Sequence, residues 1–321
     1  MKPREYVNNP LVPQRADPWC VRGGDGCVYF TGSVPAYDRI EILKAPSLRE
    51  LAFAEPKVVW RKHQSGPMSF HIWAPELHFI DGRWFLYFAA GRAESVWDIR
   101  MWVLENPNLD PTQGNWEEKG QLFTDWDSFS LDFTTFEHRG ARYGVWAQKD
   151  PQIVGNTNLY IAAMEDSTSI RGPQRLLTRP ELEWETQGFG VNEGAAVLVK
   201  NGRVWVTYSG SATDARYCMG LLWADGDSDW LDPSSWHKSP HPVLESSAEN
   251  GQFGPGHSCF FQSADEQTDL LIYHARPYRD IEGNPLYDPN RHARVGLIKW
   301  DAAGMPVFGA PASDGPLRIG R

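Results

Sequence analysis

Two short apolar runs separated by a turn recur along the chain, and the pattern is clearest in residues 71–91, HIWAPELHFIDGRWFLYFAAG. There an acidic residue, Glu76, precedes an apolar run, Asp81-Gly82 follows, and an aromatic run ends in small residues. Asp-Gly between two apolar runs is a strong signal for a β-hairpin. The pattern therefore predicts a hairpin, and it raises the question of why a carboxylate stands at its mouth.

Four other segments share this pattern: an ionisable residue, an apolar run, a turn, and a second run rich in aromatic residues. The five segments are 16–33, 71–91, 131–148, 192–211 and 256–276. Their leading ionisable residues are Asp17, Glu76, Asp132, Glu193 and His257, spaced 59, 56, 61 and 64 residues apart. A repeat of this length with strands in each unit is typical of a β-propeller.

The sequence thus predicts an all-β fold, a single five-bladed β-propeller that occupies residues 1–321. A blade needs four strands, and further apolar runs supply the strand that follows each hairpin: RIEILKA, DIRMWVLEN, TNLYIAAME, ARYCMGLLWA and ARVGLIKWD. The best candidate for a helix is short, APSLRELAF at 45–53. Because the innermost strands of a propeller run beside the central axis, the five leading side chains should surround one polar cavity. A shared, solvated cavity would explain carboxylates at the mouths of otherwise buried strands.

Composition narrows the classes of partner. The formal net charge is −10, which opposes binding to nucleic acid or to an anionic membrane, because both require basic surfaces. No run of 18 apolar residues is present, so no transmembrane helix is predicted. The 15 tryptophans suit a sheet protein with aromatic-lined clefts, and a neutral substrate is compatible with the charge.

The cysteines and the first residues predict a location. Cys20, Cys27, Cys218 and Cys259 show no CxxC spacing, which favours free thiols in a reducing compartment. Residues 1–19 contain no apolar segment of the kind found in a secretory signal. We therefore expect a cytoplasmic protein, although a secreted chain whose signal peptide had been removed would look the same.

Short motifs at the leading residues connect the chain to a known family. They are Arg15-Ala16-Asp17-Pro18, Trp73-Ala74-Pro75-Glu76, Ser130-Leu131-Asp132, Asn192-Glu193-Gly194, Gly256-His257-Ser258 and Tyr273-His274-Ala275-Arg276. In order and spacing they resemble glycoside hydrolase family 43, whose five-bladed propellers cleave arabinosides and xylosides with inversion. Residues 31–42 and 58–78 are similar to the exo-acting α-L-arabinofuranosidases of that family.

The resemblance implies three catalytic roles. Asp17 would be the general base, Glu193 the general acid, and Asp132 the residue that orients the acid and tunes its pKa. The chemistry fits these residue types, because inverting hydrolysis needs two carboxyl groups roughly 6.5–9.5 Å apart, with room for water between them. Blades one and four are not adjacent, so their carboxylates can face each other across a pocket. A neighbouring carboxylate would raise the pKa of the acid.

The resemblance and the residue types also suggest binding roles. Arg276 would hold the sugar in the −1 subsite, and His257 would ligate a water-rich Ca²⁺ at the propeller axis or remain purely structural. Trp73 offers a flat apolar wall for a sugar ring, and Asp38 could bind sugar hydroxyls. Glu76 is placed near the substrate or, because the chemistry needs no fourth carboxylate, in a structural hydrogen-bonding role. No organic cofactor is expected.

These assignments predict an inverting, exo-acting α-L-arabinofuranosidase. Its substrate would be an arabinose-containing oligosaccharide or polysaccharide, with α-1,5-linked arabino-oligosaccharides as the first choice. A β-D-xylosidase of the same family is the first alternative, since the catalytic trio does not distinguish the two sugars. A non-catalytic carbohydrate-binding propeller is the second, and it has no need of an acid opposite a base.

Overall fold

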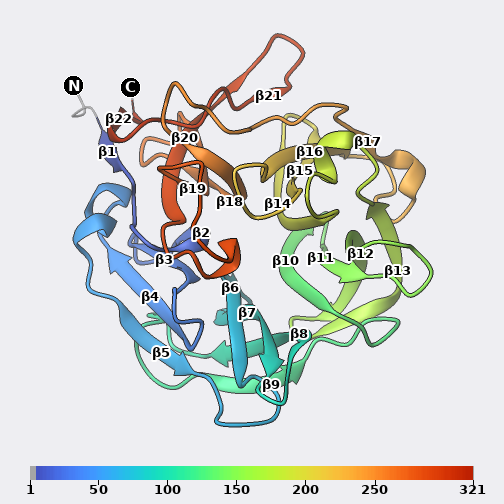
Figure 1. Ribbon diagram of the computed structural model, residues 1–321. Helices are drawn as coiled ribbons and strands as arrows, with labels where there is room; N and C mark the ends of the chain where they lie inside the picture. Colours follow the sequence, from blue (N-terminus) through green and yellow to red (C-terminus); the bar gives the residue numbers. More distant parts are fainter. Residues whose placement is uncertain (1–4, 321) are drawn as a thin grey trace.

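Five antiparallel sheets surround a central axis in the computed structural model, which describes residues 5–320 (Figure 1). Each sheet contains four strands in chain order, so each is one blade, and the predicted five-bladed propeller is confirmed. The helices among the described residues are four short 3-10 segments: η1 (Leu48–Phe53), η2 (Glu183–Glu185), η3 (Pro233–Ser235) and η4 (Pro285–Tyr287). The first of these lies in the segment for which a short helix was expected. No helix in the described part of the chain is long and apolar enough to cross a membrane.

The strands follow the predicted repeat closely. Blade I contains β2 (Ala16–Arg22), β3 (Val28–Ser33), β4 (Arg39–Ala45) and β5 (Lys57–Arg61). Blade II contains β6 (Phe70–Ile80), β7 (Arg83–Arg92), β8 (Ser95–Asn106) and β9 (Glu117–Gln121). Blade III contains β10 (Ser130–His138), β11 (Ala141–Lys149), β12 (Thr157–Asp166) and β13 (Ser169–Thr178). Blade IV contains β14 (Asn192–Lys200), β15 (Arg203–Gly210), β16 (Cys218–Asp225) and β17 (His237–Lys238). Blade V contains β18 (Phe253–Gln262), β19 (Asp269–Arg276), β20 (His292–Trp300) and β21 (Pro306–Val307).

Local turn chemistry explains the tight inner hairpins. In three blades both turn residues have positive φ, as a type I′ turn requires. The pairs are Asp81-Gly82 (49° and 80°), Arg139-Gly140 (51° and 76°) and Asn201-Gly202 (54° and 73°). These turns join the first two strands of blades II, III and IV. They fix the register that places the strand mouths at the axis.

Every innermost strand carries a β-bulge at the same point near its start. Two residues of the strand lie opposite one of its neighbour, between Ala16 and Trp19 in blade I and at the corresponding place in the other blades. The first of these two residues has left-handed backbone: Asp17 (φ 53°), Ala74 (45°), Asp132 (56°), Gly194 (59°) and His257 (40°). A bulge bends the strand and re-aims its side chains. Here it does so in every blade at the axis, and the innermost strands of blades II and V carry a second register shift just before it.

The bulges correct the alignment of the repeat inferred from residue types. Asp17, Asp132 and His257 occupy equivalent positions, but Glu76 lies two residues beyond its bulge position and Glu193 one residue before it. Because successive side chains of a strand point in opposite directions, an offset of one residue changes where a side chain points. Glu193 is therefore equivalent to Trp73, and both side chains line the cavity described below.

Hydrogen bonds between neighbouring blades hold four of these left-handed peptides. In each case a side chain of one blade accepts a hydrogen bond from the bulge N–H of the next. The bonds run from Ala74 N to Ser33 Oγ (2.8 Å), Gly194 N to Asp132 Oδ2 (2.9 Å), His257 N to Ser209 Oγ (2.8 Å) and Asp17 N to His274 Nδ1 (3.1 Å). Left-handed backbone costs a non-glycine residue about 1–2 kcal/mol, and these bonds offset part of that cost.

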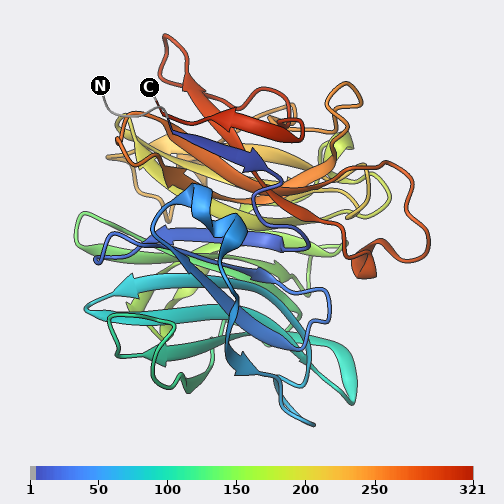
Figure 2. The same cartoon turned by 90° about the vertical axis from the view of Figure 1, so that its left-hand side faces the viewer.

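The ends of the propeller are joined by a separate two-stranded sheet. β1 (Tyr6–Asn9) pairs antiparallel with β22 (Gly315–Arg318), and the two lie side by side in Figure 1. The Leu11 N–H donates to the Ala293 carbonyl at 2.8 Å, which ties the first strand to blade V. Figure 2 shows the same closure from the side, together with the loop between β19 and β20 that projects from the propeller and carries η4.

Candidate active site

One cavity of about 780 Å³ opens at the axis, where the innermost strands begin. All five blades contribute to its lining, through Asp17 of β2, Trp73 of β6, Asp132 of β10, Glu193 of β14 and His257 of β18. The structure therefore brings together five of the residues singled out in the sequence. Four of the five leading ionisable side chains therefore share one pocket, whereas in the opening hairpin Trp73, not Glu76, lines it.

Three basic side chains surround the carboxylate of Asp17. Its Oδ2 accepts a hydrogen bond from Ser33 Oγ at 2.6 Å, and its Oδ1 lies 3.4 Å from Arg291 Nη1, 3.4 Å from His257 Nδ1 and 3.5 Å from His274 Nδ1. Burial alone would raise the pKa of Asp17, but Arg291, the two imidazoles and the Ser33 hydroxyl hold that pKa well below its usual value. Burial lowers the pKa of both histidines, so Arg291 supplies the permanent positive charge. Asp17 is thus ionised across the neutral range.

Arg291 is a component that sequence reasoning missed. It is buried, it lies in the loop between β19 and β20, and its Nη2 donates to the Tyr37 hydroxyl at 2.8 Å. Tyr37 in turn donates to the Leu286 carbonyl at 2.5 Å, which joins blade I to the same loop. This loop, residues 277–291, is longer than the corresponding loops of the other blades, so the repeat offered no signal for this arginine.

Glu193 and Asp132, from the neighbouring blades IV and III, form a second group of carboxyl side chains in the pocket. Glu193 Oε1 accepts a hydrogen bond from the Tyr217 hydroxyl at 2.9 Å, and Asp132 Oδ2 accepts the Gly194 N–H at 2.9 Å. Burial, with a smaller contribution from the charge of Asp17, raises the pKa of Glu193 to about 7 against the opposing effect of Tyr217. Burial and the neighbouring Glu193 raise the pKa of Asp132 well above its usual value. Glu193 and Asp132 therefore retain protons near neutral pH.

The pocket thus holds an ionised carboxylate and a protonated carboxyl group at the same pH. Two carboxyl groups whose environments push their pKa values apart form the acid and base of a hydrolytic reaction. The ionised group can accept a proton from water, and the protonated group can donate one to a leaving oxygen. The geometry supports acid–base chemistry on a substrate bound between blades I and IV.

Trp73 lines the pocket as the sequence suggested. Its ring stacks on His71, with centroids 4.2 Å apart and an interplanar angle of 25°, and it contacts Tyr37 and Trp97 edge-on or at a tilt. His71 is held on both ring nitrogens, 3.0 Å from the Val96 carbonyl and 3.0 Å from the Tyr287 hydroxyl. The aromatic wall is therefore rigid and spans blade II and the β19–β20 loop.

Arg276, expected to hold the sugar, does not line the cavity. Its side chain is 1% exposed, and all three nitrogens are engaged. Nε donates to Asp288 Oδ1 at 3.1 Å, Nη1 to the Thr213 carbonyl at 2.8 Å, and Nη2 to the Pro285 carbonyl at 2.6 Å. Thr213 and Pro285 themselves line the cavity, so Arg276 joins two of its walls from behind.

Asp38 and Glu76 also lie outside the cavity lining. Asp38 pairs with Arg39 at 2.7 Å in a half-exposed position. Glu76 is buried, with Oε2 2.9 Å from His78 Nε2. Burial raises the pKa of Glu76 well above its usual value and lowers that of His78 to about 3, so the two form a hydrogen bond between neutral groups. This contact agrees with the structural role weighed for Glu76.

The surroundings of His257 do not form a metal site on their own. Its Nδ1 faces Asp17 Oδ1 at 3.4 Å and Asp132 Oδ2 at 3.8 Å. Within residues 5–320, no group of three or more histidine, cysteine, aspartate or glutamate side chains is arranged to hold a metal ion. Ca²⁺ takes six to eight oxygen ligands, so the donors present do not fit it without many waters.

Comparison with known proteins agrees with the fold and the pocket. The family model described as glycosyl hydrolases family 43 matches residues 7–306, which is most of the chain. The chain belongs to glycoside hydrolase family 43. The match covers all five innermost strands and the three carboxyl groups of the pocket. The resemblance noted from the short motifs is thus confirmed.

Several named arabinofuranosidases are similar along nearly the whole chain. An extracellular exo-α-(1→5)-L-arabinofuranosidase of Streptomyces avermitilis is 50% identical over 99% of this chain and 66% of its own length. An α-L-arabinofuranosidase 43 of Humicola insolens is 49% identical over 98% of this chain and 65% of its own length. The chain therefore spans slightly less than two thirds of these two relatives. A crystal structure of an α-L-arabinofuranosidase from Lactobacillus brevis superposes with a TM-score of 0.94 at 50% identity, covering 96% of this chain and 98% of the other.

The names of these relatives overturn one expectation. Two relatives, the one from Streptomyces avermitilis and one from Streptomyces chartreusis that is 51% identical over 88% of this chain, are named extracellular enzymes. The expected cytoplasmic location is therefore wrong. It rested partly on four unpaired cysteines, and these are free thiols in the structure. A domain of this size has a core large enough to fold without disulfides, so free thiols do not identify the compartment.

Proposed function

We propose that the protein is an inverting, exo-acting α-L-arabinofuranosidase that releases terminal arabinofuranose from α-1,5-linked arabino-oligosaccharides or an arabinose-containing polysaccharide. The observation that carries the proposal is the split ionisation of the pocket. Asp17 is held ionised beside Arg291, while burial keeps Glu193 protonated up to a pH of about 7. The names of the relatives support the choice of sugar and linkage.

In the proposed reaction Asp17 accepts a proton from a water molecule as that water attacks the anomeric carbon. Glu193 donates its proton to the glycosidic oxygen as the bond from that oxygen to the anomeric carbon breaks. The products are arabinose with inverted anomeric configuration and the shortened glycan, whose former glycosidic oxygen is now a hydroxyl group. Asp17 is then protonated and Glu193 ionised, and proton exchange with solvent restores both. The attack comes from the face opposite the leaving group, which requires the two carboxyl groups to lie on opposite sides of the sugar.

Asp132 acts in this proposal through the acid. Its carboxyl group accepts the N–H of Gly194, the residue that follows Glu193, and thereby fixes the backbone at the acid. Its proximity to Glu193 also favours retention of a proton by the pair. Trp73 provides the apolar wall for the sugar ring.

The first test compares two chromogenic substrates. We expect rapid release of p-nitrophenol from the α-L-arabinofuranoside and slow release from the β-D-xylopyranoside, with Asp17→Ala as the matched inactive control. Proton NMR of the first-formed sugar from arabinotriose should show β-arabinose, the inverted anomer. Faster xyloside hydrolysis would identify a β-D-xylosidase instead. Retention of the anomeric configuration, or release from neither substrate, would contradict the proposal.

A Ca²⁺ ion at the axis remains a separate prediction. His257 offers one nitrogen donor, so water would have to supply the other ligands. If the ion stabilises the propeller, chelation should lower the melting temperature, added Ca²⁺ should restore it, and His257→Ala should behave like the chelated protein. Elemental analysis must show that the chelated sample is metal-free. An unchanged melting temperature and activity in that sample would refute the prediction.

A further inference from the structure

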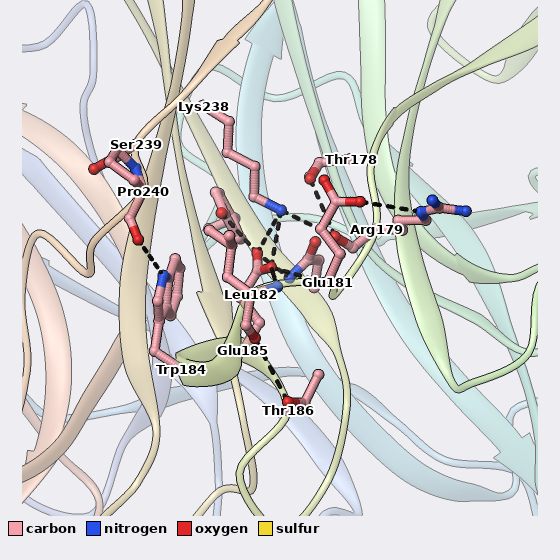
Figure 3. Close-up of polar contacts among 12 residues, drawn as sticks. Thr178, Arg179, Glu181, Leu182, Trp184, Glu185, Thr186, Lys238, Ser239 and Pro240 are labelled. Carbon is pink, nitrogen blue, oxygen red and sulfur yellow. Dashed lines mark hydrogen bonds and ion pairs between the residues drawn. The ribbon is translucent and has the colours of Figure 1, made fainter.

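Glu185, the last residue of η2, is a carboxylate with 0% exposure in blade IV, outside the cavity lining. Its Oε1 accepts hydrogen bonds from Asn192 Nδ2 at 3.0 Å and from the Tyr208 hydroxyl at 2.8 Å. Its Oε2 accepts the backbone N–H groups of Glu181 at 2.9 Å and Leu182 at 2.8 Å. Figure 3 shows Glu185 with the neighbouring Glu181 and Leu182. Such a concentration of donors is what a buried charge requires.

Lys238 supplies the opposite charge from β17, the outermost strand of the same blade. Its Nζ lies 2.8 Å from Oε1 and 2.9 Å from Oε2 of Glu185, and it donates to the Arg179 carbonyl at 2.9 Å. The ammonium also lies 5.9 Å from the centre of the Tyr208 ring. Both oxygens of Glu185 are thus fully occupied. A buried ion pair of this kind is strongly disrupted when one partner is removed.

The pair joins strands that are not neighbours in the sheet. Asn192 belongs to β14, Tyr208 to β15 and Lys238 to β17, so one carboxylate links the inner edge of the blade to its outer edge. Glycine permits this close approach, because a Cβ on Gly210 would lie 3.1 Å from the Glu185 Cα. The arrangement is therefore built into both the side chains and the backbone of the blade.

The same carboxylate stands at the base of a cavity wall. The Glu185 carbonyl accepts the Ser211 N–H at 3.0 Å, and Ser211 Oγ accepts the Gln187 N–H at 2.9 Å. From Gln187 the chain continues through Phe189 and Val191, which line the cavity, to Asn192 at the start of β14. Displacement of Glu185 would therefore move both this wall and the mouth of β14.

We propose that Glu185 and Lys238 form a positioning pair for the general acid. The pair fixes Asn192, the residue immediately before Glu193, and so sets the direction in which the acid points. This inference rests on the proposed function, because it assumes that Glu193 is the acid. Neither Glu185 nor Lys238 touches the cavity, so the pair acts through the backbone of β14.

The test substitutes Glu185→Gln. In Glu185 one carboxylate oxygen accepts from Asn192 and Tyr208, and the other accepts from two backbone N–H groups. A glutamine has only one oxygen, so it can serve one of these two sets of donors but not the other. We expect kcat/KM to fall about 100-fold on arabino-oligosaccharides, the loss typical of a misplaced reactive group. On an activated aryl arabinofuranoside, which needs little protonation, the fall should be below about tenfold. The alkaline limb of the pH profile of kcat/KM on arabino-oligosaccharides should move as well.

A matched control removes an ion pair at the far end of β14 by substituting its partner on β19. Asp269→Asn removes the ion pair between Asp269 and Lys200, 2.6 Å apart, and Lys200 is the last residue of β14 at the end away from Glu193. This variant should have a lower melting temperature. Its ratio of kcat/KM on the two substrates and the alkaline limb of its pH profile should stay as in the wild-type enzyme. A purely structural role for Glu185 would give the same result as this control.

Two outcomes overturn the inference and are separable from failure of the proposed function. A folded Glu185→Gln variant with the wild-type substrate ratio and alkaline limb shows that the pair does not position the acid. If that variant does not fold, Asn192→Ala cuts the link while leaving the ion pair in place, and the same two measurements decide. If Glu193→Ala itself keeps wild-type activity on arabino-oligosaccharides, the acid is misassigned and the proposed function fails first.

Discussion

Asp17 and Asp132 are the same residue type at equivalent positions of two blades, yet they ionise in opposite directions. Both are the left-handed residue of a β-bulge, with φ of 53° and 56°, and they are 8% and 4% exposed. The pKa of Asp17 lies well below its usual value and that of Asp132 well above. Neither backbone nor burial distinguishes them.

The neighbours of the two residues account for the difference. Asp17 faces Arg291, brought in by the β19–β20 loop, whereas Asp132 faces Glu193 on the next blade. Desolvation raises the pKa of both aspartates, and only a nearby positive charge can reverse this effect. The comparison teaches that the propeller supplies equivalent sites and that the loops between strands decide which site becomes a base.

The largest effect is expected from Asp17→Ala. Without an ionised carboxylate beside Arg291, no group activates water, whatever the leaving group. General base catalysis contributes up to about 10⁴-fold, so kcat/KM should fall by about that factor on both oligosaccharide and aryl substrates. Steady-state kinetics on both substrates checks this. A loss confined to poor leaving groups would mean that acid and base have been exchanged.

Glu193→Ala should have a smaller and substrate-dependent effect. On arabino-oligosaccharides the loss should reach about 10²–10⁴-fold, because the leaving oxygen must be protonated. On an activated aryl arabinofuranoside it should be much smaller. In the wild-type enzyme kcat/KM should decline as the pH rises through about 7, where Glu193 loses its proton. That decline should disappear in the variant, and its persistence would assign it to another group.

Arg291→Met should make the environment of Asp17 resemble that of Asp132. An opposite charge nearby lowers a carboxyl pKa by roughly 1–3 units, so its removal should raise the pKa of Asp17. The base would then be protonated at higher pH, and the acidic limb of kcat/KM should move upwards by a similar amount. Arg291→Lys, which keeps the charge, is the control and should move the limb less. An unmoved limb in the methionine variant would rule out Arg291 as the source of the difference.

Tyr217→Phe should produce the smallest change. The hydroxyl donates to Glu193 Oε1 and lowers the pKa of the acid, against the effect of burial. Its removal should therefore raise the pKa of Glu193 above about 7 and move the alkaline limb upwards by less than about one pH unit. A pH profile of kcat/KM measures this directly. Movement to lower pH would contradict the assigned direction of the hydrogen bond's effect.

Much of the fold could be predicted because each unit of the repeat is marked by local patterns of apolar runs and turn residues. The run RIEILKA is β4 residue for residue, and Asp81-Gly82 forms the turn that its type predicts. Bulges were harder, since an extra residue in a strand leaves the apolar pattern almost unchanged. That is why Glu76 was aligned with Asp17, when Ala74 holds the equivalent place.

The site was predictable where the repeat carries it and obscure elsewhere. Asp17, Asp132 and Glu193 stand near the mouths of repeated strands. Arg291 and Glu185 lie in irregular segments between strands, where spacing carries no information. Arg276 was expected to hold the sugar, but it lies outside the cavity lining, and its three nitrogens bind loop groups that the sequence does not reveal.

The pairing of β1 with β22 has a consequence for how the chain reaches this shape. Within each blade consecutive strands are neighbours, so each can form from segments close together in sequence. The closing pair joins Tyr6 to Arg318, across almost the entire polypeptide. The entropy lost on closing a loop grows with its length, and contacts between distant segments slow folding. We therefore expect the ring to seal last, so the pocket, which needs all five blades in place, is completed only when the two ends of the chain meet.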